Sequence, residues 1–301
     1  MRSDRPTPAE LRAVVQKDRH REIGNWLARR VARPSAVYGT WLAVRLGVSA
    51  NQVTFTALVV GLAGAAALAS GDRLGLVAAA ALGHLAFWLD HVDGQVARWR
   101  GTASLDGVYY DYIMHHVVNM ALGFALGFGL AVRTGRVEWA AAGFAISLGW
   151  AVLSLHNDCR YKAFIQRLKS ASGSYRVDGG AGGRPSPPPR WPRRGLGVVT
   201  HPAYKACEPH VVLLSLTGGA LLAIIAPWAW EWCWRVYVGG MAVGAPLLGA
   251  ARVQRAVTRR ATDSEFQAWF QPLESRDGLP RPRADGFPRP PGHRRRRGYM
   301  N

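Results

Sequence analysis

The sequence predicts an all-α integral membrane protein with six transmembrane helices and an N-terminal amphipathic interfacial helix. Of its 301 residues 49% are hydrophobic, yet the formal net charge is +19. The apolar residues form long uncharged blocks, and the basic residues gather between them. A disordered basic protein would lack so much apolar sequence. The blocks also exclude a soluble DNA-binding protein, so we expect no nucleic-acid partner.

The first 45 residues form a predicted cytoplasmic segment that contains the interfacial helix. Over Glu22–Leu46, tryptophan, leucine and valine alternate with arginine. The arginines are Arg29, Arg30, Arg33 and Arg45. Such a helix lies at the membrane surface and extends its cations towards anionic lipid headgroups. Membrane lipids are therefore expected partners.

Six segments without Asp, Glu, Lys or Arg define a predicted membrane domain over residues 46–258. A helix needs about 20 largely apolar residues to cross a hydrocarbon core of roughly 30 Å. The segments are Leu46–Gly71, Leu74–Leu89, Tyr112–Val132, Trp139–Asn157, Pro209–Trp230 and Val236–Ala251. They are rich in glycine and alanine, which let membrane helices approach closely.

The distribution of basic residues predicts the orientation of these helices. Of the 38 lysine and arginine residues, 34 lie either before the first block or after the second, fourth or sixth block. The remaining four are Arg73, Arg133, Arg136 and Arg235. Since short basic loops stay on the cytoplasmic side, we expect an even number of crossings and both termini in the cytoplasm.

Two further segments are predicted to lie outside the bundle. Residues Ser170–Gly197 include 12 glycines and prolines among 28 residues, a composition that is costly in entropy to order. We therefore expect a flexible cytoplasmic loop over about 170–197. The tail over 259–301 is rich in proline and arginine and is expected to be disordered, in contact with anionic headgroups.

The most informative polar residues are acids at the end of the second block and the start of the third. Asp90 and Asp93 are three residues apart, and Asp111 and His115 are four apart. Each pair falls near one face of a helix, and the short turn between them makes the two helices antiparallel neighbours. Facing carboxylates near a membrane repel unless a cation lies between them, and divalent ions with oxygen ligands are the usual solution.

Small residues beside these acids leave room for a ligand. Gly94, Ala97 and Gly107 have no side chain that would keep a nucleotide or diphosphate away from the helix backbone. The alternative is that the acids only cap helix ends or pair with Arg98 and Arg100.

The segment DHVDGQVAR at residues 90–98, followed after eight residues by GVYYDYIMH at 107–115, resembles the signature of CDP-alcohol phosphatidyltransferases. That signature is D-x2-D-G-x2-A-R, eight or nine residues, then G-x3-D-x3-D, and only its last aspartate is replaced, by His115. SANQVT at 49–54 is similar to the PNxxT element that opens the family's first crossing, with Ala50 in place of proline. The resemblance implies six transmembrane helices, an interfacial helix and a homodimer.

The resemblance also implies a reaction of phospholipid biosynthesis and a role for each matching residue. An alcohol hydroxyl attacks the phosphorus of CDP-diacylglycerol or another CDP-alcohol, and CMP is released. The implied ligands of one or two Mg²⁺ or Mn²⁺ ions are Asp90, Asp93, Asp111 and His115. The implied nucleotide site contains Gly94, Ala97, Arg98 and Gly107, with Asn51 and Thr54 at its cytoplasmic mouth.

His115 and Asp111 are the implied catalytic residues, and His115 is the departure from the signature. An imidazole can take a proton from an alcohol near neutral pH. As a ligand it offers one nitrogen in place of two oxygens, which favours Mn²⁺ over a bridged pair of magnesium ions. The alternative is a bundle histidine in a protein whose chemistry is altered or lost.

The acceptor is expected to be a small polar alcohol, such as inositol phosphate or glycerol phosphate. Arg160 and Lys162, at the end of the fourth block, are the candidate cations for its phosphate, although they also suit ordinary membrane anchoring. Two other functions stay open. One is transfer of phosphocholine or phosphoethanolamine from its CDP derivative to diacylglycerol. The other is a non-catalytic membrane protein or a cation transporter.

Overall fold

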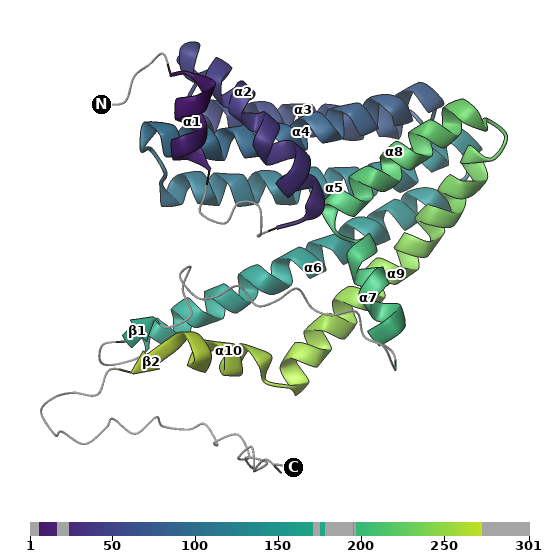
Figure 1. The fold of residues 1–301 in the computed structure, drawn as a ribbon. Coiled ribbons are helices and arrows are strands. Elements are labelled where there is room, and N and C mark those ends of the chain that lie inside the picture. The colour runs from purple at the N-terminus through teal and green to yellow at the C-terminus, as the bar shows by residue number, and fades with distance from the viewer. Residues whose placement is uncertain (1–5, 17–23, 171–174, 178–194, 196, 273–301) are drawn as a thin grey trace, which may run out of the picture.

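The computed structural model describes residues 6–16, 24–170, 175–177, 195 and 197–272, and over these residues the chain is a bundle of long helices (Figure 1). The helices are α1 (Pro8–Val15), η1 (Ala28–Ala32), α2 (Arg33–Arg45), α3 (Ala50–Ala69), α4 (Arg73–Arg100), α5 (Leu105–Thr134), α6 (Glu138–Lys169), α7 (Gly197–Ala206), α8 (Pro209–Ile225), α9 (Trp230–Thr258) and α10 (Ala261–Trp269). Two short strands, β1 (Tyr175–Val177) and β2 (Phe270–Pro272), pair antiparallel. The predicted helical fold class is confirmed.

Five of the described helices are long and apolar enough to cross a membrane, namely α3, α4, α5, α6 and α9. Helices α7 and α8 form a pair bent by 75° that counts as a sixth span if the two are taken together. The predicted fifth crossing, Pro209–Trp230, is too long, because α8 ends at Ile225 and Trp230 already begins α9. The turn between these two helices contains no charged residue. The end of α8 therefore could not be located from the absence of charges. These helices indicate a multi-pass membrane protein.

Local sequence signals set the turns between the first three spans. Ser49 caps α3, Asp72 caps α4 and Ser104 caps α5, each accepting a hydrogen bond from a backbone N–H in the first turn. For Asp72 that bond comes from Gly75 N–H at 2.6 Å and holds the pKa of the carboxyl below its usual value. Helix α4 ends at Gly101, whose φ of 66° is left-handed and favours glycine. The chain can therefore reverse directly from α4 into α5.

The predicted interfacial helix forms as η1 followed by α2. Asn25 begins it by accepting a hydrogen bond from Ala28 N–H at 2.8 Å. One face is buried against α4, including Ala36 and Thr40, while Tyr38 and Leu42 on the opposite face are exposed. One face of this helix therefore packs on α4 and the other carries exposed apolar side chains, and its place at the membrane surface stays a prediction.

A further helix, α1, precedes the interfacial helix and was not predicted from the sequence. It begins with a capping box, in which the Thr7 hydroxyl accepts from Glu10 N–H and the Glu10 carboxylate accepts from Thr7 N–H. Leu11 and Val15 are fully buried and pack in one cluster with Trp99 of α4. The N-terminal segment is thereby fixed on the end of α4 that carries the acidic motif.

The start of the predicted tail also has structure. Helix α10 and strand β2 lie beside the far end of α6, which extends past the bundle (Figure 1). Phe164 of α6 is buried among the rings of Phe266, Trp269 and Phe270. The aromatic rings give the segment enough apolar contact to order it. Within the predicted loop the described residues are Ser170, Tyr175–Val177, Gly195 and Gly197; its other residues and the tail beyond residue 272 lie outside the described residues.

Helices α5 and α6 approach each other closely at a pair of glycines. A Cβ atom at Gly127 would collide with the carbonyl oxygen of Trp139 and the backbone of Gly143. Small residues are what allow such an approach between membrane helices. The crossing therefore depends on glycine at this position.

We expect Gly127→Val to force α5 and α6 apart and to destabilise the protein by about 1–3 kcal/mol, the usual cost of overpacking. The change is measured as a lower thermal midpoint in detergent. Gly240→Val in α9 is the matched control, because nothing lies within 4 Å of a Cβ at Gly240. Equal midpoints for the two variants would contradict the proposed role of the glycine contact.

Candidate functional site

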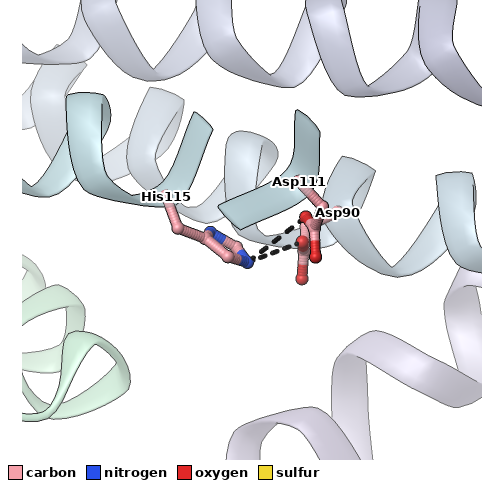
Figure 2. A group of neighbouring side chains, drawn as sticks. All are labelled: Asp90, Asp111 and His115. Carbon is pink, nitrogen blue, oxygen red and sulfur yellow. Dashed lines mark ion pairs between the residues drawn. The ribbon is translucent and has the colours of Figure 1, made fainter. Parts of the chain in front are cut away.

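Three side chains from two helices converge in the structure (Figure 2). Nε2 of His115 lies 3.1 Å from Oδ1 of Asp90 and 3.4 Å from Oδ1 of Asp111. One ligand atom from each residue can be chosen so that all three lie within 4.8 Å of one another. The other carboxylate oxygen of Asp90 lies 3.2 Å from Nδ1 of His91. We call Asp90, Asp111 and His115 the acidic cluster.

The fold explains why these three residues meet. Asp90 lies on α4, while Asp111 and His115 are four residues apart on α5 and so share a face of that helix. The turn after Gly101 places α5 antiparallel to α4, which brings the two faces together. The predicted convergence of carboxylates from the second and third spans is therefore present.

The acidic cluster suits one divalent cation. It offers two carboxylates and one imidazole, a donor set that fits Mg²⁺ and, with its nitrogen, fits Mn²⁺ better. Oδ1 of Asp111 is shielded from solvent and makes no hydrogen bond within the part of the chain that the structure describes, although Nε2 of His115 lies 3.4 Å away and is also in contact with Asp90. A buried carboxylate oxygen that shares one nitrogen with a second carboxylate is poorly satisfied. A bound cation would satisfy it.

Asp93, also predicted as a metal ligand, does not belong to this group of three. It is 7% exposed, and its Oδ2 accepts a hydrogen bond of 2.6 Å from the hydroxyl of Thr54 on α3. Residues three apart on an α-helix point about 60° apart around the axis. Asp90 therefore faces α5 and Asp93 faces α3. Thr54, predicted at the mouth of the site, instead holds this carboxylate.

The other residues of the signature lie around the same end of α4. A Cβ at Gly94 would come within 3.3 Å of the Arg98 guanidinium, so glycine leaves room for that side chain. Nε of Arg98 donates a hydrogen bond of 2.7 Å to the carbonyl of Val15 in α1. Ala97 accepts the hydrogen bonds that end α4, from Gly101 and Thr102.

Gly107 and Asn51 are neighbours where α5 and α3 begin. A Cβ at Gly107 would lie 3.9 Å from Oδ1 of Asn51, which is exposed. Asn51 is exposed, Gly94, Ala97 and Gly107 are partly exposed, and Thr54 is buried. The backbone of the motif is therefore only partly covered at its small residues.

A large cavity of about 820 Å³ adjoins the acidic cluster. We call it the central cavity. Asp90 and His115 line it together with residues from α6, α7, α8 and α9. Its arginines are Arg33 and Arg252. The predicted nucleotide residues Gly94, Ala97, Arg98, Gly107, Asn51 and Thr54 do not line it.

Arg160 and Lys162, predicted to bind the acceptor, do not line the central cavity. Arg160 forms an ion pair with Glu265 of α10, and Lys162 is exposed. The sequence could not show this, because Glu265 lies in a segment that composition assigned to a disordered tail.

Sequence reasoning missed polar residues on the far wall of the cavity. Nη2 of Arg252 lies 3.4 Å from Oδ1 of Asn157, and the Arg252 guanidinium lies 5.9 Å from the centre of the Tyr204 ring. Nε2 of His116 lies 3.0 Å from Oδ2 of Asp158. The charged end of α9 was visible in the sequence, but nothing in it marked Arg252 as directed inward.

The comparisons with known proteins agree with the motif. The model of the CDP-alcohol phosphatidyltransferase family matches residues 47–162, which include α3, α4, α5 and all of the acidic cluster. This confirms the resemblance over that segment. The family consists of phosphotransferases of lipid synthesis that act on CDP-alcohols and typically depend on divalent metals. No curated protein matches the chain.

We expect Asp90→Asn to weaken Mn²⁺ binding by about tenfold or more, since even outer-shell changes at metal sites cost 10–100-fold. The measurement is a titration of purified protein with Mn²⁺, followed by the spin-resonance signal of the free ion. Asp106→Asn is the matched control on α5, because Asp106 is exposed and outside the acidic cluster. If both variants bind Mn²⁺ like the unmodified protein, the cluster is not the metal site.

Proposed function

We propose that the protein is a metal-dependent transferase that moves a phosphatidyl group from CDP-diacylglycerol to a small polar alcohol and releases CMP, in phospholipid biosynthesis. The observation that carries this proposal is the convergence of Asp90, Asp111 and His115 at the wall of the central cavity, inside the segment that matches the family. The transferase domain is residues 46–258. The metal is Mg²⁺ or Mn²⁺.

Asp90, Asp111 and His115 would hold the cation. When bound, such an ion neutralises the charge that builds up on the attacked phosphate and on the departing CMP. Asp93 keeps a separate role, in which the Thr54 hydroxyl fixes its carboxylate against α3 beside the nucleotide face. The partly exposed region around Gly94, Gly107 and Asn51 then receives the CMP part of the donor, with Arg98 and Ala97 at its edge.

The acceptor hydroxyl must lose its proton as its oxygen bonds to phosphorus and the bond to CMP breaks. His115 makes both of its contacts through Nε2, and a neutral imidazole that ligates through Nε2 carries a proton on Nδ1. It then has no lone pair for a second proton. Asp111 has two oxygens, so one can ligate while the other accepts the proton. We assign proton transfer to Asp111 and ligation to His115.

The far wall of the central cavity is the proposed acceptor site. It presents the amide of Asn157, the carboxylate of Asp158 and the guanidinium of Arg252 to the space in front of His115. An amide and a carboxylate can hydrogen-bond the hydroxyls of a polyol, and a guanidinium suits a phosphate. An acceptor such as inositol phosphate or glycerol phosphate therefore fits, with Arg252 in the role that was predicted for Arg160 and Lys162.

We propose that this end of the bundle faces the cytoplasm, with both termini on that side. The loops with most of the basic residues follow α4, α6 and α9, and the acidic cluster lies near the same end of α4. The CDP headgroup of CDP-diacylglycerol and a phosphorylated alcohol are both charged, so both reach the protein from the aqueous side of the membrane.

We expect purified protein with Mn²⁺ or Mg²⁺ to release CMP from CDP-diacylglycerol when an acceptor from a panel of small alcohols is present. The lipid product is identified by mass spectrometry. Release of CMP from CDP-choline with diacylglycerol, and not from CDP-diacylglycerol, would assign the rival phosphotransferase activity. If neither donor releases CMP and CDP does not stabilise the protein thermally, the alternative of a non-catalytic membrane protein or cation transporter is favoured.

For Arg252→Gln we expect the KM for a phosphorylated acceptor to rise about tenfold or more, while the KM for CDP-diacylglycerol stays unchanged. The physical reason is the loss of charge-assisted hydrogen bonds to one substrate only. Arg255→Gln is the control, because Arg255 lies on the same helix, is exposed and does not line the cavity. If the KM for CDP-diacylglycerol rises and the KM for the acceptor does not, Arg252 binds the donor and the proposed acceptor site is wrong.

A further inference from the structure

Arg33 is the first residue of α2, and its side chain lines the central cavity together with Asp90 and His91. The sequence alone assigned this arginine to the lipid headgroups, as one of four cations on an interfacial helix. The exposed Arg30 on the preceding turn fits that assignment. Arg33 differs because it is half-buried and directed towards the site.

The backbone of α2 is fixed to the motif helix at this position. Gln95, inside the signature of α4, is 2% exposed, and its Nε2 donates a hydrogen bond of 3.0 Å to the carbonyl of Arg33. Its Oε1 accepts a hydrogen bond of 2.9 Å from the hydroxyl of Thr40, which is fully buried. Buried amides with both ends satisfied hold one geometry. The signature leaves position 95 open, so these two bonds are a property of this chain.

Further contacts hold α2 against the same helix. The indole N–H of Trp88 donates a hydrogen bond of 3.0 Å to the hydroxyl of Ser35, two residues after Arg33. Ala36 packs in one buried cluster with Val92 and Val96 of α4. The first turn of α2 therefore has a defined place relative to Asp90, and the Arg33 side chain starts from a rigid support.

The position of Arg33 suits an anion. Its electrostatic neighbours are Arg29, Arg98 and Asp90, and Asp93 lies near Arg98. Burial and the nearby Arg29 lower the pKa of the Arg33 guanidinium from its ordinary value. Arginine nonetheless stays protonated at neutral pH. At the wall of the central cavity beside Asp90, its planar guanidinium can make bidentate hydrogen bonds to a phosphate group.

We propose that Arg33 binds the diphosphate of the CDP-linked donor and that Gln95 is the positioning residue that holds it there. The inference rests on the proposed function, because it places this diphosphate beside the acidic cluster. The interfacial helix then supplies part of the active site in addition to resting on the membrane. A lipid phosphate offers the same chemistry as the donor, so the experiment has to separate the two sources.

The test compares Arg33→Gln with Arg30→Gln, two arginines of the same amphipathic segment that differ in access to the cavity. For Arg33→Gln we expect the KM for CDP-diacylglycerol to rise about tenfold or more and the thermal stabilisation by CDP to fall by a similar factor in apparent affinity. The acceptor KM stays unchanged. Arg33→Lys should keep part of the affinity for CDP that Arg33→Gln loses, because lysine keeps the positive charge without the planar fork. Arg30→Gln behaves like the unmodified protein in all three measurements.

Binding to vesicles of anionic phospholipid separates the two phosphate sources. If Arg33→Gln and Arg30→Gln weaken vesicle binding equally and leave the response to CDP intact, Arg33 is only a headgroup contact and the inference is wrong. If the unmodified protein itself neither responds to CDP nor releases CMP, the proposed function fails instead. The two failures are therefore distinguishable.

Gln95→Leu tests the positioning role with a double-mutant cycle. Gln95→Leu alone should weaken the response to CDP, and adding it to Arg33→Gln should cause little further loss, because both changes act through one side chain. A thermal midpoint measured without CDP separates this effect from general destabilisation. Fully additive losses in the response to CDP would contradict the proposed link between Gln95 and Arg33.

Discussion

Asp90 and Asp111 face each other inside a bundle of apolar helices, and the rest of the site depends on how their repulsion is balanced. Two like charges at short range interact far more strongly in a protein interior than in water. The imidazoles of His115 and His91 lie within 3.1 and 3.2 Å of Asp90 and supply the partners that the described structure contains. A divalent cation is a stronger partner with the same preference for oxygen and nitrogen. The fold therefore maintains a pair of carboxylates whose two negative charges one divalent cation would balance.

Three polar residues on different faces of α4 connect the acidic motif to neighbouring helices. Asp90 faces α5, Asp93 accepts a hydrogen bond from Thr54 of α3, and Gln95 bonds to the backbone and side chains of α2. Each is a buried or half-buried polar group with its own partner, which is the condition under which such groups specify one packing. The short motif that supplies the chemistry thus also holds α2 and α3 against α4, whereas α5 packs mainly on α3 and α6. Changing the motif would alter the packing as well as the reaction.

The sequence was sufficient for the features that depend on local pattern. Uncharged blocks located the spans, and the spacing of Asp90, Asp111 and His115 placed them on facing helices. Features that depend on contacts between distant segments could not be predicted. Helix α1 had a readable capping box, but only its packing on Trp99 explains why so short a helix is stable. The pairing of Arg160 with Glu265 removed a residue from the predicted acceptor site, because a segment with a tail-like composition folds against α6. Spacing alone also placed Asp93 with Asp90, whereas the partner of each is decided by which helix lies on its side.

The positions of the cavity's two arginines bear on the choice between a transferase and a cation transporter. Arg33 lines the cavity from α2 and Arg252 lines it from α9, and Asp90 and His115 of the acidic cluster line the same cavity. A pathway for cations is expected to present acids along its length, since fixed positive charges raise the energy of a passing cation. A transferase whose donor and acceptor both carry phosphate needs cationic side chains where each anionic group lies. Two carboxylates outside the acidic cluster, Asp158 and Glu208, also line the cavity, but Asp158 is paired with His116 and Glu208 with Lys205. The two arginines are therefore the groups of the lining that suit anionic ligands beside the acidic cluster.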